Sequence, residues 1–164
     1  TEDLLLSFTI PVFSRRAKRK TISHPKFYFF DSGVFRSLRP RGPLDRATEI
    51  EGAALEGLVA QHLRAWISYR RTDDRLYFWR TRSGVEVDFV VYGEDGLWAV
   101  EVKNGSVVHR KDLRALKSFG QDYPESRRIF LYRGMERLLI DDILCLPVED
   151  FLRFLEPSRS LASL

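Results

Sequence analysis

The sequence predicts an α/β domain with a mixed β-sheet flanked by helices. Apolar residues recur at three- and four-residue spacing over 49–69, which is typical of a helix that buries one face. Strand-like runs follow at 75–81, 85–92 and 97–103, then a second amphipathic helix at 109–123 and a strand at 127–133. The order of a helix, three strands, a helix and a strand favours an α/β fold with parallel and antiparallel pairs.

The elements nearer the two ends are shorter. Residues 4–13 and 26–30 have the apolar and aromatic composition of strands. Asp31 or Ser32 is placed to cap a short helix that ends near residue 38. After a Pro- and Gly-containing loop at 39–45, the predicted order continues with the elements above, then short strands within 138–147 and a helix over 148–157.

Composition excludes several classes of protein. With 44% hydrophobic and 13% aromatic residues, a chain of 164 residues can bury a sizeable core. Because it has no apolar stretch of about 20 residues and no signal peptide, we expect a cytoplasmic protein without a membrane partner. The single Cys145 forms no disulfide within the chain and reads as a small buried hydrophobe rather than a nucleophile.

The stretch VEVDFVVYGEDGLWAVEVK at 85–103 predicts a β-hairpin that carries four charged residues in its two arms. With GEDG at 93–96 as the turn, Tyr92 pairs with Leu97. The same register places Asp88 opposite Glu101, and it also places Glu86 opposite Lys103.

Because side chains alternate along a strand, we expect all four charges on one face of the hairpin. The other face would be uninterrupted and hydrophobic, made of Val87, Phe89, Val91, Trp98, Val100 and Val102.

Two carboxylates directly across a strand pair have Cβ atoms only about 5 Å apart, and their repulsion destabilises the pair. The spacing of Asp88 and Glu101 therefore predicts a divalent cation, Mg²⁺ or Mn²⁺, bound between hard oxygen ligands. Lys103 would then lie beside the metal, where it could orient or deprotonate a water or stabilise charge on a phosphate. The alternative is a cross-strand ion pair of Glu86 with Lys103, with the other two acids solvated at a sheet edge.

Asp88, the hairpin and then Glu101-Val-Lys103, preceded by a helix that bears an acid, resemble the PD-(D/E)xK nuclease superfamily. GAALEGLVAQHL, GVEVDFVV and LWAVEVKNG are similar to the arrangement in archaeal Holliday-junction resolvases. The resemblance implies a restriction-endonuclease-like core in which Glu56, Asp88 and Glu101 bind metal. It also implies that these three residues and Lys103 are catalytic. The chain departs from the pattern at Val87, where the superfamily often has proline.

A second resemblance covers nearly the whole chain. KFYFFDSGVF, EGAALEGLVAQHL, LYFWRTRSGVEVDFVV and VEVKNG are similar to the domain of unknown function (family 4143) found C-terminal to the ATPase core of many prokaryotic AAA-type ATPases. The family order K-x-Y-F-x-D-x-G, G-x-x-x-E, Y-W-R-T, E-V-D-F and E-V-K recurs here, with Phe78-Trp79 in place of Tyr-Trp.

That resemblance implies an ATPase domain upstream in the same polypeptide. The chain has no GxxxxGK[ST] loop, so we expect ATP to bind only in that upstream domain. It begins at Thr1 and has one methionine, Met135, which fits a fragment of a longer protein as well as removal of an initiator methionine. We expect 1–25 to be a linker or the end of a winged-helix-like segment, 26–156 the nuclease-like domain and 157–164 a flexible tail.

Basic residues provide candidate contacts to nucleic acid, and the net charge of +4 is compatible with a polyanion. The run RRAKRK could bind a phosphate backbone, or it could be a solvated turn. Arg80 and Arg82 precede the hairpin and could bring a phosphate towards the acids. The full set of candidates is Arg15, Arg16, Lys18, Arg19, Lys20, Arg80 and Arg82.

Three functional hypotheses follow from these patterns. The first is a Mg²⁺-dependent nuclease acting on DNA in preference to RNA. The second is a catalytically silent nuclease-fold module that binds DNA or protein for an ATPase. The third is a structural domain whose charges form an ion-pair network. The sequence leaves open whether the protein forms a homo-oligomer.

Overall fold

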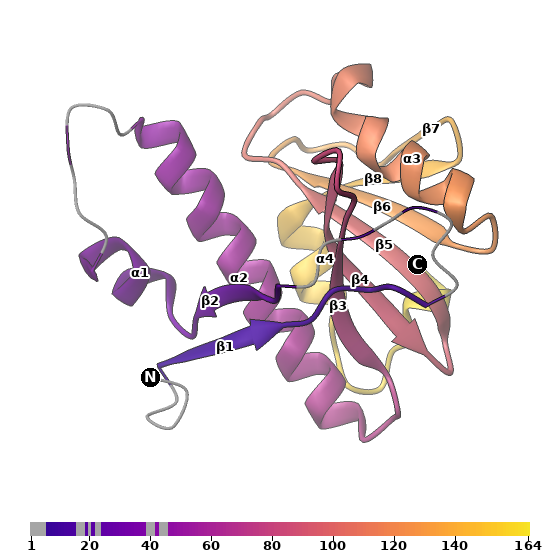
Figure 1. Ribbon diagram of the computed structural model, residues 1–164, viewed down its shortest axis with the longest axis horizontal. Coiled ribbons are helices and arrows are strands. Elements are labelled where there is room, and N and C mark those ends of the chain that lie inside the picture. Colours follow the sequence, from indigo (N-terminus) through magenta and orange to yellow (C-terminus); the bar gives the residue numbers. More distant parts are fainter. Residues whose placement is uncertain (1–5, 16–18, 20, 22–23, 39–41, 43–45) are drawn as a thin grey trace.

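A six-stranded mixed β-sheet with helices on both faces forms the centre of the protein (Figure 1). The computed structural model describes residues 6–15, 19, 21, 24–38, 42 and 46–164. The strands in spatial order are β3 (Arg75–Arg80), β4 (Glu86–Gly93), β5 (Gly96–Val102), β6 (Arg127–Tyr132), β8 (Ile143–Pro147) and β7 (Leu138–Ile140). Pairing is parallel for β5–β6 and β6–β8 and antiparallel elsewhere, so the predicted α/β class with a mixed sheet is confirmed.

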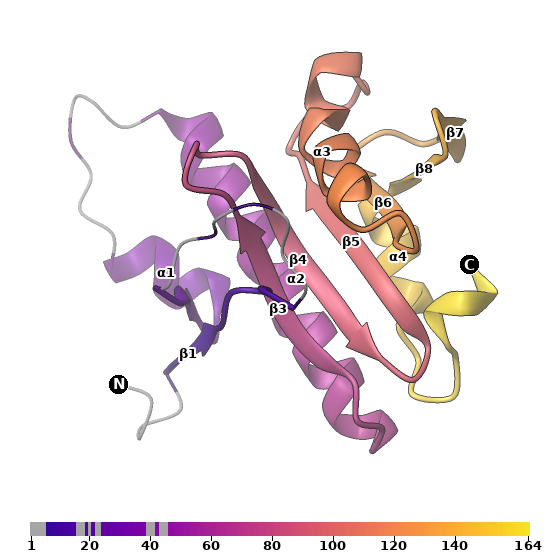
Figure 2. The same cartoon turned by 45° about the vertical axis from the view of Figure 1, so that its right-hand side comes forward.

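The helices divide between the two faces of this sheet (Figure 2). They are α1 (Ser32–Leu38), α2 (Ala47–Arg70), α3 (Arg114–Asp122) and α4 (Val148–Phe154), with 3₁₀ turns η1 (Arg110–Leu113) and η2 (Leu161–Ser163). One core cluster joins α2, α4 and the sheet, and a second joins η1, α3 and the opposite face. A separate two-stranded sheet of β1 (Ser7–Ile10) and β2 (Lys26–Phe29) packs into the α2 side.

Helix α2 matches the helix that the periodicity predicts over 49–69, and it supplies much of the core on its side. Its buried residues are Ala54, Leu55, Val59, Ala60, Leu63 and Trp66. His62 has the spacing of this stripe but is exposed, and its Nδ1 lies 2.8 Å from the Leu58 carbonyl oxygen. Burial follows the line that Val59, Leu63 and Trp66 define, which passes beside His62.

The β4–β5 hairpin has the register that the GEDG turn predicts. Pairs run from Gly93–Gly96 through Tyr92–Leu97 to Phe89–Val100, with Gly96 at a φ of 113°. That positive φ favours glycine at the end of the turn. Helix α2 holds the turn through an ion pair between Arg70 Nη2 and Asp95 Oδ2 at 2.6 Å.

A β-bulge in β4 changes which way its side chains point. In the β3–β4 pair, Tyr77 lies opposite Val90 but Trp79 lies opposite Val87, so one residue of β3 faces two residues of β4. The extra residue interrupts the two-residue alternation at Asp88. The expected uninterrupted apolar face is therefore wrong: Val87 packs in the cluster on the α3 side, whereas Phe89 packs on the α2 side.

Both end segments of the described chain pack against the sheet. Pro11 and Phe13 exchange backbone hydrogen bonds with Phe78 at the edge of β3, and Phe13 is buried on the α3 side. At the other end, the segment expected to be a flexible tail forms η2, with Leu161 fully buried. Whether residues 1–25 belong to an upstream domain stays a prediction.

Two features of the composition can be compared with the described structure. Among the described residues, none of the helices combines the length and the apolar character that crossing a bilayer requires. Cys145 is fully buried on β8, and burial raises the pKa of its thiol to about 11, as expected of an unreactive core cysteine.

Gly93, at the end of β4, has no room for a side chain. A Cβ there would lie 2.6 Å from the Cα of Asp74 and 1.9 Å from its Oδ1. We expect Gly93→Ala to lower the free energy of unfolding by about 1–3 kcal/mol through forced backbone displacement, measured by chemical denaturation. Gly57→Ala is the control, because nothing lies within 4 Å of its Cβ position on α2. This control should stabilise the protein by about 1 kcal/mol, and equal effects of the two substitutions would contradict the packing described.

Candidate functional site

Acidic side chains from three elements meet where the pairing of β4 and β5 stops. Glu56 comes from α2, Glu86 and Asp88 come from β4, and Glu101 comes from β5. The hydrogen-bonded pairs of the hairpin end at Phe89–Val100, one pair before Asp88 and Glu101. Lys26 of β2 and Lys103, just after β5, supply ammonium groups to the cluster. These six residues are called the carboxylate cluster below.

Asp88 occupies the gap between the two strands. The bulge turns its side chain towards β5, where Oδ2 accepts a hydrogen bond of 2.9 Å from the backbone N–H of Val102. The residue is only 8% exposed. Burial, then the negative charges of Glu101 and Glu56, raise the pKa of the Asp88 carboxyl well above its usual range, and the charge of Lys26 opposes this rise.

Glu101 and Lys103 form a close pair on the next strand. Lys103 Nζ lies 2.9 Å from Glu101 Oε1, while Glu101 Oε2 is buried and has no hydrogen-bond partner among the described residues. Burial raises the pKa of Glu101 despite the opposing charge of Lys103. Burial lowers the pKa of Lys103, but Glu101 more than compensates and raises it overall. Lys103 is thus a charged hydrogen-bond donor. It is suited to orient a water molecule or to stabilise an anion, and not to remove a proton from water.

The ammonium group of Lys26 lies among the carboxylates of Glu56, Glu86 and Asp88. Its Nζ lies 2.6 Å from Glu56 Oε1, 2.5 Å from Glu86 Oε1 and 3.6 Å from Asp88 Oδ1. Burial lowers the pKa of Lys26, but attraction to Glu56, Asp88 and Glu86 outweighs it and raises the pKa above its ordinary value. The ammonium therefore stays charged and neutralises acids that would otherwise repel one another.

Tyr28, which lies on β2 with Lys26, holds Glu56 of α2 in position. Its hydroxyl donates a 2.6 Å hydrogen bond to Glu56 Oε1, the oxygen that also contacts Lys26. Its ring packs on Phe89 with centroids 5.9 Å apart. Burial, followed by the charge and the hydrogen bond of Glu56, raises the pKa of the Tyr28 phenol, so it serves only as a donor.

The expected placement of all four hairpin charges on one face is wrong. Glu86 lies with Lys26 on the α2 side, and its other contact is Arg80 Nη1 at 3.4 Å. Glu101 alternates with Val100 and Val102, both packed on the α2 side, so it leaves the sheet towards α3. The alternative ion pair of Glu86 with Lys103 is also not what the structure shows, because each pairs with another residue.

A divalent cation fits part of this cluster. Asp88 and Glu101 are buried, lie near each other and have raised pKa values, and the orphaned Glu101 Oε2 has the chemistry of a hard-metal ligand. The third predicted ligand, Glu56, instead binds Lys26 and Tyr28. Within the described part of the chain, no three His, Cys, Asp or Glu side chains are grouped so as to hold a metal ion. Two of the three predicted ligands thus fit as placed, and Glu56 does not.

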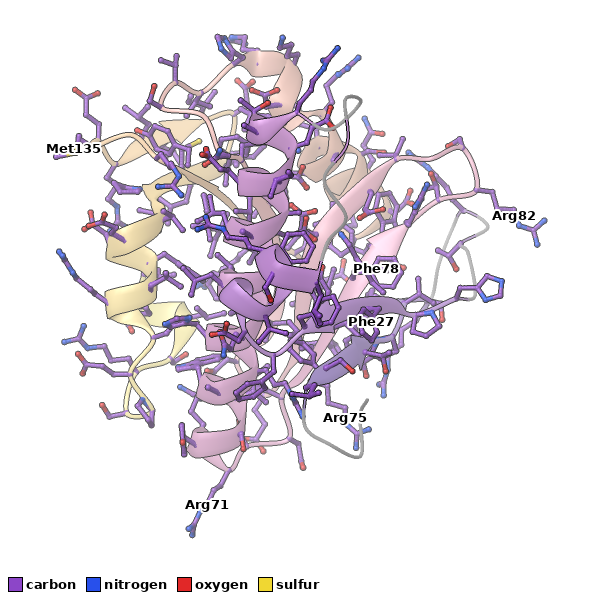
Figure 3. All side chains as sticks on the ribbon, turned by 90° about the vertical axis from the view of Figure 1, so that its left-hand side faces the viewer. Phe27, Arg71, Arg75, Phe78, Arg82 and Met135 are labelled. Atoms are coloured by element: carbon purple, nitrogen blue, oxygen red, sulfur yellow. The ribbon has the colours of Figure 1, made fainter. Side chains whose placement is uncertain are left out.

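The predicted nucleic-acid contacts are dispersed. Arg15 stacks over the Tyr92 ring at 4.9 Å, and Arg19 pairs with Asp122 at 3.2 Å, so both have structural partners away from the cluster. Arg80 joins the cluster through Glu86. Arg82 points away from the protein at the β3–β4 turn (Figure 3).

The remaining basic candidates, Arg16, Lys18 and Lys20, lie outside the described residues.

Sequence reasoning missed two members of the site, Lys26 and Tyr28. The segment KFYFF predicts a strand and belongs to the family resemblance, but no local pattern indicates a partner for its charge. A signal was present, because the K-x-Y-F part of the family order contains both residues. The structure brings that motif together with the acids of G-x-x-x-E and E-V-D-F through the contacts of Lys26 and Tyr28.

Comparison with known proteins gives one family. Residues 51–151 match the family described as "Domain of unknown function (DUF4143)", a stretch that includes Glu56, Glu86, Asp88, Glu101 and Lys103. The chain is also similar to "Uncharacterized protein Rv2008c" of Mycobacterium tuberculosis and "Uncharacterized protein Mb2031c" of Mycobacterium bovis, at 29% identity over 156 residues in each case. The alignment covers 93% of this chain but only 34% of each relative, so the chain spans about a third of their length. No solved structure matches the chain.

Burial of Asp88 should cost stability. An acid whose pKa is raised on folding holds its proton more tightly in the folded state, so its ionisation lowers the free energy of unfolding as pH rises above the usual value of 3.8. We expect Asp88→Asn to raise the melting temperature at pH 7 by ~2–4 °C, the shift that about 1 kcal/mol produces in a domain of this size. The gain should shrink as pH falls towards 3.8, in thermal melts over a pH series.

The control for this experiment is Asp150→Asn, which makes the same change at an exposed position of α4. It should leave the melting temperature nearly unchanged at every pH. A lower melting temperature for Asp88→Asn than for the wild type at pH 7 would contradict the described electrostatics.

Proposed function

The chain belongs to the DUF4143 family, and we propose that its carboxylate cluster hydrolyses DNA phosphodiester bonds with a divalent cation, Mg²⁺ or Mn²⁺. The observation that carries the proposal is the proximity of the buried Asp88 and Glu101 where the β4–β5 pairing ends, with Lys103 beside them. Buried carboxylates with raised pKa values in such a setting are typical of functional sites. The resemblance to PD-(D/E)xK nucleases, which stays a prediction, assigns the same residues.

Asp88, Glu101 and Lys103 have roles that their placement permits, whereas Glu56 would first have to leave Lys26. Asp88 and Glu101 would hold the cation, with Glu56 joining directly or through water. A cation bound there would act as a Lewis acid on the phosphate and lower the pKa of a bound water. Lys103 keeps its proton and is 46% exposed, so its ammonium can donate to the attacking water or to a phosphate oxygen at the surface.

A second candidate function has its own supporting observation. Lys26 binds Glu56 and Glu86 directly, which neutralises the acids without any metal. A module held in that state would bind DNA or protein but would not cleave, as a domain that retains a nuclease fold can do. The third hypothesis, a purely structural ion-pair network, explains the contacts of Lys26 but not the orphaned oxygen of Glu101.

The proposed setting is an ATPase. The resemblance that places such domains after an AAA-type core implies that ATP binds upstream in the same polypeptide. The greater length of the mycobacterial relatives leaves room for such a domain. Coupling to an ATPase would let the bound nucleotide control access of the site to DNA. Assembly into a homo-oligomer would then be determined by contacts of the ATPase domain and not by this domain.

Cleavage assays with linear and branched DNA and with RNA, in Mg²⁺ or Mn²⁺, test the proposal. We expect cleavage of DNA that falls at least ~100-fold in Asp88→Asn, in Glu101→Gln and in Lys103→Met, because each change removes a ligand or an electrostatic donor. The control is Glu149→Gln, a charge change on α4 at a side chain that is 78% exposed.

Cleavage that persists unchanged in both Asp88→Asn and Lys103→Met would come from a contaminant and would contradict the catalytic assignment. Salt-sensitive DNA binding without cleavage in any protein would favour the silent module. Cleavage of RNA in preference to DNA would support the assigned catalytic residues but contradict DNA as the substrate.

A further inference from the structure

Lys26 occupies the side of Asp88 that faces Glu56. Its Nζ is 2.6 Å from Glu56 Oε1 and 3.6 Å from Asp88 Oδ1, so the ammonium lies between the two oxygens that a bridging metal would use. A Mg²⁺ ion binds carboxylate oxygens at about 2.0–2.1 Å. The ammonium and the metal therefore cannot bind both oxygens together.

The charges of the cluster lead to the same competition. Its four acids are Glu56, Glu86, Asp88 and Glu101, and its cationic partners are Lys26, Lys103 and Arg80. The formal charge of the carboxylate cluster together with Arg80 is thus −1 with Lys26 in place and −2 without it. A divalent cation would neutralise the charge of −2 that remains without Lys26. With Lys26 in place it would leave a net positive charge.

Lys26 is also attached differently from the acids. The acids come from α2 and from the six-stranded sheet, whereas Lys26 belongs to β2 in the separate two-stranded sheet. Its side chain is a flexible chain of four methylene groups and is 25% exposed, so the ammonium can reach solvent. The lysine can leave the acids without disrupting the pairing of β4 with β5.

We propose that Lys26 is a built-in competitor of the divalent cation, which must be displaced before Glu56 can join Asp88 and Glu101 around a metal ion. The inference rests on the proposed function and adds a regulatory step to it. With Lys26 bound, Glu56 is occupied and the charge of the acids is partly compensated. With Lys26 displaced, three acids are free to form the site. Any contact that draws β2 away from α2 would then favour metal binding.

Titration with Mn²⁺ alone, followed by calorimetry and by the electron paramagnetic resonance of free Mn²⁺, tests this proposal. We expect Lys26→Met, which keeps the length of the side chain but removes its charge, to bind Mn²⁺ at least ~10-fold more tightly than the wild type. The control is Arg80→Met, which removes one positive charge from Glu86 without a contact to Glu56 or Asp88. Its affinity should stay within ~2-fold of the wild type because Arg80 is 47% exposed and well screened.

A second measurement uses the wild type and does not depend on the folding of a variant. The side-chain ammonium resonance of Lys26 should shift as Mg²⁺ is added and saturate with the calorimetric affinity. Those of lysines outside the carboxylate cluster, such as Lys117, which pairs with Asp141, should not move.

The outcomes separate this inference from the proposed function. Equal Mn²⁺ affinity in the wild type and Lys26→Met, or an equal gain in Arg80→Met, would overturn the competition while leaving a metal site intact. A resonance of Lys26 that is unchanged at saturating Mg²⁺ would do the same. Absence of binding in the wild type and in Lys26→Met would overturn both the competition and the metal-dependent function.

Discussion

Repulsion between buried carboxylates is the constraint on which the rest of the structure depends. Glu56, Glu86, Asp88 and Glu101 share a small region, and the burial of Asp88 and Glu101 removes much of the screening that water provides. The protein compensates with the ammonium of Lys26 on one side of the sheet and that of Lys103 on the other. Burial, followed by the charges of Glu101 and Glu56, still raises the pKa of Asp88, because the charge of Lys26 offsets these effects only in part. Buried carboxylates with raised pKa values are typical of functional sites, which makes the cluster a candidate for one.

The architecture brings these groups together through three separate devices. The bulge of β4 opposite Phe78 turns Asp88 into the gap beyond the last β4–β5 pair. The long helix α2 crosses the same end of the sheet and presents Glu56. The two-stranded sheet packs on α2 through Tyr28, which carries Lys26 with it. Loss of any one device would leave the acids apart or uncompensated, so the fold and the site are linked.

The order of elements and the hairpin register could be predicted from the sequence, because the periodicity of α2 and the GEDG turn are local signals. The bulge at Asp88 could not, since a strand with one extra residue has the same alternating pattern on paper. The role of Lys26 could not be derived from local pattern either: its partner Glu86 is 60 residues away. The hairpin register indicates Asp88 and Glu101, and the resemblance adds Glu56 from a motif on another element. The K-x-Y-F motif with Lys26 and Tyr28 is part of the same resemblance, but nothing local to it indicates which acids it contacts.

A crystal structure of the protein grown with Mn²⁺, recorded at a wavelength where manganese scatters anomalously, tests the central claim most directly. The claim is that the acids at the β4–β5 opening form a cation site that Lys26 closes. It predicts an anomalous peak within coordinating distance of Asp88 and Glu101, with the Lys26 ammonium withdrawn from Glu56. An anomalous map with no peak at these carboxylates, and with Lys26 still bound to Glu56 and Glu86, would contradict it.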